Sequence, residues 1–166
     1  PMSYFSAVES QLDDFAAKYP EFSRREAGLI RLIRAVDRQI TDHANNNLRQ
    51  FGLTLTEYNV LTMLDARGSG MSISELVKRT GEKPSNTTRL TDLLVKKNLL
   101  VREVSDKDRR VWLVKISKDG KALMKKMLPV INEQLSQLFQ GFDDAQYQAL
   151  YSNLHSLLNT SDRDSL

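Results

Sequence analysis

Two short helical segments and a hairpin follow one another between residues 72 and 117, and this succession constrains the fold more than any other stretch of the chain. The first helical segment stops at Gly81, and Pro84 starts the second one three residues later. A glycine stop followed closely by a proline start is typical of a helix-turn-helix. Two strand-like runs, 99–104 and 111–116, then predict an antiparallel hairpin. The expected fold class is therefore mainly α with a small β-hairpin wing (α+β), a winged helix-turn-helix.

The second helical segment has two different faces, because successive side chains step by about 100° around a helix. The inward face predicted from this angle consists of Thr87, Leu90, Thr91 and Leu94. The outward face is polar and consists of Ser85, Thr88, Arg89, Asp92 and Lys96, with Asn86 at the border. Hydroxyls, amides and arginines are the usual readers of base edges and phosphates in the major groove of DNA. A solvated helix face can have the same composition, but Pro84 at the first helical position and the positive end of the helix favour phosphate binding. We therefore expect Ser85, Asn86, Thr88 and Arg89 to contact DNA.

The hairpin has a charged turn that ends in two arginines, Asp106-Lys-Asp-Arg-Arg110. Paired arginines at an exposed turn often serve only solubility. Next to a polar helix face they can instead enter the minor groove, where negative potential is concentrated. Asp108 is placed to hold the Arg110 guanidinium through a bidentate contact, because side chains two apart on a strand point the same way. We expect Arg109 and Arg110 to bind DNA and Asp108 to orient Arg110.

Charge is distributed unevenly along the chain. The net charge of all 166 residues is only +3, yet residues 78–126 hold 15 Lys and Arg against six Asp and Glu, a net +9. The rest of the chain carries −6. A basic centre between acidic flanks is the pattern expected of a nucleic-acid reader. An anionic membrane surface would instead call for a single basic amphipathic helix.

Composition also argues against several functional classes. Hydrophobic residues make up 40% and charged residues 27%, and no apolar run approaches the length of a membrane span. Without cysteine or a signal-peptide pattern, we expect a cytoplasmic protein. The only histidines are His43 and His155, and no phosphate-cradling glycine loop is present. We therefore expect no metal, no cofactor and no enzymatic activity.

Several strings resemble the MarR family of bacterial winged-helix regulators. They are Leu53-Thr-Leu-Thr-Glu-Tyr-Asn-Val-Leu61, Ser74-Glu-Leu76, Asn86-Thr-Thr-Arg89, Asp106-Lys-Asp-Arg-Arg110 and Ile116-Ser-Lys-Asp-Gly120. The likeness covers roughly residues 28 to 158, and the helix and wing strings are most similar to the multidrug-efflux repressor branch. Asn98 stands where the family usually has a glycine, and asparagine is the next-best residue for a left-handed helix cap. The resemblance implies a bacterial transcription factor that lies on the nucleoid when it is bound to its operator.

Apolar residues at helical spacing predict long amphipathic helices on both sides of the winged segment. We expect N-terminal dimerisation helices over 2–51, a winged helix-turn-helix DNA-binding domain over 52–117 and C-terminal dimerisation helices over 118–166. The flanking helices could fold back on their own subunit or pair in a symmetric dimer. The resemblance implies the intertwined homodimer, which would place two recognition helices about 10 base pairs apart on a near-palindromic operator.

The resemblance further implies a ligand-binding crevice between the dimer helices and the winged domain, with aromatic acids, phenols or lipophilic drugs as ligands. We expect Arg34, Arg38 and His43 of the long helix and Tyr58 of the next helix to line it, with an arginine fixing a carboxylate and Tyr58 stacking on a ring. The alternative is that these are surface arginines and a core tyrosine. The function expected is a repressor that a ligand shifts away from its operator-binding geometry. A winged-helix adaptor that binds protein and not DNA is the alternative function.

Overall fold

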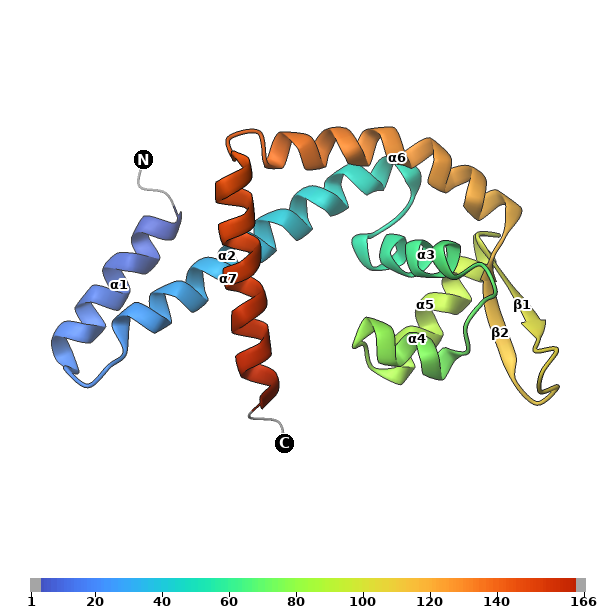
Figure 1. The fold of residues 1–166 in the computed structure, drawn as a ribbon, viewed down its shortest axis with the longest axis horizontal. Helices are drawn as coiled ribbons and strands as arrows, with labels where there is room; N and C mark the ends of the chain where they lie inside the picture. Colours follow the sequence, from blue (N-terminus) through green and yellow to red (C-terminus); the bar gives the residue numbers. More distant parts are fainter. Residues whose placement is uncertain (1–3, 164–166) are drawn as a thin grey trace. The chain divides into compact units, whose positions relative to one another are not determined.

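The computed structural model describes residues 4–163 and has the mainly helical fold with one hairpin that the sequence predicts (Figure 1). The N-terminal helices are α1 (Tyr4–Lys18) and α2 (Arg24–Leu48), which continues into a 3-10 turn, η1 (Arg49–Phe51). The winged segment contains α3 (Leu55–Arg67), α4 (Ile73–Thr80), α5 (Pro84–Lys96), β1 (Leu100–Val104) and β2 (Trp112–Ile116). The C-terminal helices are α6 (Lys118–Leu138) and α7 (Asp144–Arg163). Residues 2, 3 and 164–166, which the two predicted dimerisation segments include, lie outside the described residues.

The chain divides into two compact units between Lys121 and Ala122. The first unit holds every element from α1 to β2 and the first turn of α6. The second unit holds the rest of α6 together with α7. The residues expected to contact DNA or a small ligand all belong to the first unit.

The core of the winged segment is formed by aliphatic side chains from α3, α4, α5 and the hairpin, among them Val60, Leu61, Leu64, Leu76, Leu94, Leu100 and Val114. The inward face predicted for α5 is confirmed, since Thr87, Leu90, Thr91 and Leu94 are all buried. The hairpin is antiparallel, and Leu100 pairs with Ile116 at its base. Met71 adds an isolated bridge to Val114, with N–O distances of 2.8 and 3.0 Å. The segment before α4 is thereby joined to the wing.

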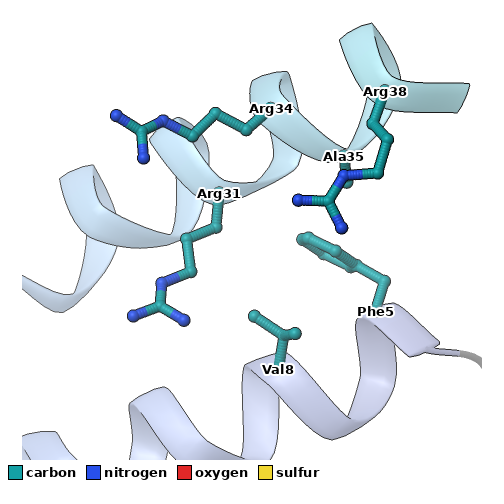
Figure 2. A pocket seen from close by; sticks show the side chains of 6 residues that line it. All are labelled: Phe5, Val8, Arg31, Arg34, Ala35 and Arg38. Carbon is teal, nitrogen blue, oxygen red and sulfur yellow. The ribbon is translucent and has the colours of Figure 1, made fainter. Parts of the chain in front are cut away.

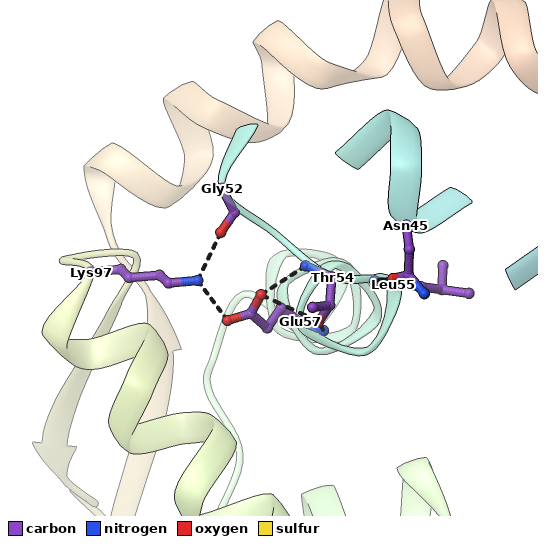
Figure 3. A network of polar contacts seen from close by, with 6 residues as sticks. All are labelled: Asn45, Gly52, Thr54, Leu55, Glu57 and Lys97. Atoms are coloured by element: carbon purple, nitrogen blue, oxygen red, sulfur yellow. Dashed lines mark hydrogen bonds and ion pairs between the residues drawn. The ribbon is translucent and has the colours of Figure 1, made fainter. Parts of the chain in front are cut away.

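Lys97, directly after α5, reaches back to the start of α3 (Figure 3). Its ammonium group donates to the carbonyl oxygen of Gly52 and to Oε1 of Glu57, each at 2.7 Å. Glu57 Oε2 accepts the backbone N–H of Thr54 at 2.7 Å, and Thr54 Oγ1 accepts the backbone N–H of Glu57. This reciprocal pair is a capping box at the N-terminus of α3. The Glu57 side chain is only 3% exposed, so these partners replace the water that its carboxylate would otherwise bind.

Many large apolar side chains outside the winged segment are exposed. On α2 they include Leu29, Ile30, Leu32, Val36 and Ile40, and on α7 Tyr147, Tyr151 and Leu158. Leu158 is 66% exposed, although it belongs to a helix with a regular apolar stripe. Leu29, Leu32, Val36 and Ile40 recur every three or four residues and so share one face of α2, and an exposed apolar face usually marks an interaction surface. Within residues 4–163, none of the helices combines the length and apolarity that crossing a membrane requires.

Candidate nucleic-acid interface

Local sequence signals place α5 on the surface with its N-terminus open. The preceding helix, α4, begins at Ser72, whose Oγ accepts the backbone N–H of Glu75 at 3.2 Å, and ends at Gly81 with φ +69°. Pro84 occupies the first turn of α5, and the capping position is held by Lys83, which makes no side-chain capping bond. The first backbone N–H groups of α5 are therefore not occupied by a capping side chain, which leaves them available to a phosphate.

An open groove runs along the outer face of α5 and is lined by Ser85, Thr88, Arg89, Asp92, Leu93 and Lys96. Five of these are the residues that the helical angle assigns to the outward face, so the structure brings the predicted set together. Asn86 is half-buried at the border of this face. Sequence reasoning missed Leu93, which is 38% exposed in the groove four residues after Arg89. An apolar side chain here is suited to contact a thymine methyl group.

Arg89 is held in place by its neighbours on α5. Its Nη2 donates to Asn86 Oδ1 at 3.0 Å, and Asn86 Nδ2 donates to Glu82 Oε2 at 2.6 Å. Thr88 Oγ1 donates to the carbonyl oxygen of Pro84 at 3.0 Å. The arginine is thus pre-oriented by a chain of hydrogen bonds that begins at Glu82, a residue that the sequence reasoning did not single out.

The structure corrects the role predicted for Asp108 at the wing tip. Its Oδ1 accepts the backbone N–H of Arg110 at 2.9 Å, rather than the guanidinium. Among residues 4–163, no carboxylate lies within 4 Å of the Arg109 or Arg110 guanidinium. The physical reason is that an aspartate readily closes a turn onto the N–H two residues on, which is nearer than the end of a long side chain. Asp108 therefore shapes the tip, and both arginines extend from it exposed.

Ion pairs connect the wing internally and to α5. Arg102 of β1 pairs with Asp92 of α5, and Lys115 of β2 pairs with Glu103 of β1 at 2.5 Å. The hydrogen bond from Lys115 to the Glu103 carboxylate raises the pKa of Lys115. The outer face of α5 and the hairpin are therefore linked by an ion pair as well as by the shared core.

The four residues expected to bind a ligand are only partly brought together. Arg34 and Arg38 line one pocket, which lies between α1 and α2 and includes Arg31 (Figure 2). His43 lies on the surface of α2, and half-buried Tyr58 lies on α3; neither lines this pocket. The sequence reasoning missed Arg31, although its spacing from Arg34 and Arg38 already placed it on their face of the helix.

Comparison with known proteins identifies relatives that regulate transcription. A family model described as MarR family matches residues 51–111. The Escherichia coli (strain K12) protein named transcriptional repressor MprA is 26% identical over 162 residues, which cover 97% of this chain and 92% of that protein. The curated relatives are named as transcriptional regulators or repressors and not as enzymes.

Solved structures share the fold. The structure of a MepR–DNA complex from S. aureus has a TM-score of 0.71 and 20% identity, covering 78% of this chain and 93% of that one. The structure of CouR from Rhodococcus jostii RHA1 bound to p-coumaroyl-CoA has a TM-score of 0.68 and 24% identity, covering 76% and 88%. The winged helix-turn-helix predicted from the sequence is confirmed by these likenesses.

Proposed function

Because the chain belongs to the MarR family of transcriptional regulators, we propose that it is a repressor that binds a near-palindromic operator as a homodimer and is released by a small ligand. The observation that carries the DNA-binding part is the open polar groove along α5. It has the chemistry that base edges and phosphates require, and it lies on a helix whose N-terminus is left uncapped by side chains.

In this proposal, Ser85, Asn86, Thr88 and Arg89 enter the major groove. Arg109 and Arg110 of the wing reach the adjacent minor groove, and Asp108 keeps the tip in the shape that presents them. The exposure of both arginines and the absence of an internal carboxylate partner for them within residues 4–163 support this assignment.

The exposed apolar faces of α2 and α7 support the homodimer. Residues 2–51 and 118–166 would serve dimerisation, and 52–117 would bind DNA. A two-fold symmetric dimer presents two copies of α5, and half-sites about 10 base pairs apart would match them. We place this dimer in the bacterial cytoplasm, on the nucleoid when operator is bound.

The effector in this proposal is a small aromatic acid, phenol or drug, and CouR is a neighbour in the fold whose solved structure contains p-coumaroyl-CoA. Arg34 and Arg38, with His43 and Tyr58, are the residues proposed to take part in the response. A ligand with greater affinity for the dimer geometry that does not fit the operator would shift the population away from DNA.

The test is operator binding at several salt concentrations, measured by fluorescence anisotropy with duplex DNA from upstream of the protein's own gene. Phosphate neutralisation releases counterions, so six to ten contacts would lower the affinity by about 10³–10⁵ between 50 and 200 mM salt. Arg25→Ala is a suitable control, because it removes an exposed arginine paired only with its neighbour Glu26. A shallow salt slope and no preference for the operator would favour the protein-binding adaptor instead.

A further inference from the structure

The pocket between α1 and α2 gathers three arginines on one side and apolar side chains on the other (Figure 2). Its lining consists of Phe5, Val8, Arg31, Arg34, Ala35 and Arg38. All six residues belong to the first compact unit of the chain.

The three arginines recur at intervals of three and four residues and so lie on the same face of α2. Like charges at this spacing repel one another and destabilise the helix. Asp37, three residues after Arg34, and Asp42, four residues after Arg38, oppose part of this repulsion, although within residues 4–163 neither forms an ion pair with these arginines.

Arg31, Arg34 and Arg38 also differ from other arginines of the same helix in their partners. Arg24 pairs with Asp13 at 2.7 Å, and Arg25 pairs with Glu26 at 2.9 Å. In the part of the chain that the structure describes, none of the three pocket arginines has a carboxylate within 4 Å. Their charge is therefore available to an external anion.

The opposite wall of the pocket determines what kind of anion fits. Arg31 and Arg38 extend toward Val8 and Phe5 of α1, whereas Arg34 extends away from them (Figure 2). An anion held by Arg31 and Arg38 would thus have its body against an aromatic ring and a valine. This arrangement favours a flat apolar body over a bare inorganic anion.

The size of the pocket limits the ligand further. Its volume of about 220 Å³ is below the roughly 300–1,000 Å³ typical of sites for drug-sized ligands. A single ring with one acidic group fits this space, and a nucleotide conjugate does not.

We propose that the α1–α2 pocket binds a compact aromatic carboxylate, with Arg31 and Arg38 holding the carboxylate and Phe5 and Val8 covering the ring. Arg34 adds long-range attraction from the rim. The site differs from the crevice expected beside the winged domain, because α1 forms one of its walls and neither His43 nor Tyr58 lines it. This inference rests on the proposed ligand response and gives that response a location.

The experiment is a fluorine NMR titration of the full-length protein with 4-fluorobenzoate, and with the neutral 4-fluorobenzamide as a matched probe. We expect 4-fluorobenzoate to bind and 4-fluorobenzamide to bind at least about tenfold more weakly, because the amide lacks the charge-assisted contacts. Arg31→Gln/Arg38→Gln should weaken 4-fluorobenzoate binding by about tenfold or more, and Phe5→Ala should weaken both probes. Arg25→Gln is the control, since it removes a paired guanidinium from the same helix.

The outcomes separate this inference from the proposed function. Equal binding of the two probes, unchanged binding to the double variant, or displacement of 4-fluorobenzoate by millimolar sulfate would overturn the pocket assignment. Retained binding in Arg38→Lys, which keeps the charge, would support it and show that the fold of the variants is intact.

If 4-fluorobenzoate binds as expected but leaves operator affinity unchanged, the pocket stands and the proposed ligand release falls. If release persists in the double variant and is lost in Tyr58→Ala, the response stands and this location falls.

Discussion

Arginines without carboxylate partners occur in two regions of the first unit that differ in their surroundings. Arg89, Arg109 and Arg110 project from a polar helix face and a turn closed by backbone hydrogen bonds. Arg31 and Arg38 face an aromatic and an aliphatic side chain from another helix. The same guanidinium group therefore suits a repeating array of phosphates in one region and an anion with an apolar body in the other. The two proposed functions therefore differ in the side chains that surround the arginines more than in the charge of the arginines.

The largest effect is expected from removing the arginines proposed to contact DNA. Arg89→Ala and Arg110→Ala should each weaken operator binding by about 1–3 kcal/mol. The losses should add in the double variant, because one residue lies on α5 and the other at the wing tip. Anisotropy at one fixed salt concentration measures the loss, while 4-fluorobenzoate binding should be unaffected. An operator affinity within twofold of the parent would remove these side chains from the DNA contact.

A paired cation should behave differently from both sets of arginines. Lys97→Met leaves the buried Glu57 carboxylate without its cation and should lower the free energy of unfolding by about 2–3 kcal/mol, between the values for exposed and buried pairs. Urea denaturation measures this change. Glu57→Gln in the same chain should recover part of the loss, since a neutral amide needs no counter-charge. Full stability of Lys97→Met would show that the Glu57 carboxylate does not need the lysine in the folded protein.

A smaller effect is expected at the turn that presents the wing arginines. Asp108→Ala removes the acceptor for the Arg110 N–H and should weaken operator binding by about 0.5–1.5 kcal/mol. Asp108→Asn removes the same charge but keeps an oxygen acceptor, and it should bind operator at least as well as the parent. If the two variants bind equally, the hydrogen bond plays no part in presenting the tip.

The smallest effect is expected from relieving the repulsion on α2. Arg34→Gln should raise the free energy of unfolding by at most about 0.2–0.5 kcal/mol, because it removes the repulsion from Arg31 and Arg38 together with the attraction to Asp37. Thermal or urea denaturation at low salt detects the gain, and high salt should abolish it. A loss of stability instead would mean that the Arg34 charge has a stabilising partner in the assembled protein.

Short-range rules predicted much of this structure. Pro84 at the start of α5 and the left-handed conformation of Asn98, with φ +58°, each depend on residues only a few positions apart. The inward face of α5 followed from the helical angle alone. These features were predictable because the interactions that determine them lie within one or two turns of chain.

Features that depend on distant residues were not predictable. Lys97 and Glu57 are 40 residues apart in the sequence, and no spacing rule joins them. The pocket wall formed by Phe5 depends on how α1 packs on α2. The bridge between Met71 and Val114 requires Gly70 at φ +83°, where an added Cβ would lie 2.6 Å from Lys115 Cγ. The contact predicted for Asp108 was wrong because its carboxylate accepts the nearby backbone N–H of Arg110 rather than the guanidinium.

The contact between Lys97 and the Gly52 carbonyl has a mechanical consequence (Figure 3). Gly52, with φ +69°, is the joint at which the long N-terminal helix and its 3-10 extension give way to α3. A glycine joint would ordinarily absorb a rotation of the arm before it. Lys97 directly follows α5 and bonds to that joint, so we expect a rotation of α2 about Gly52 to shift the end of α5 as well.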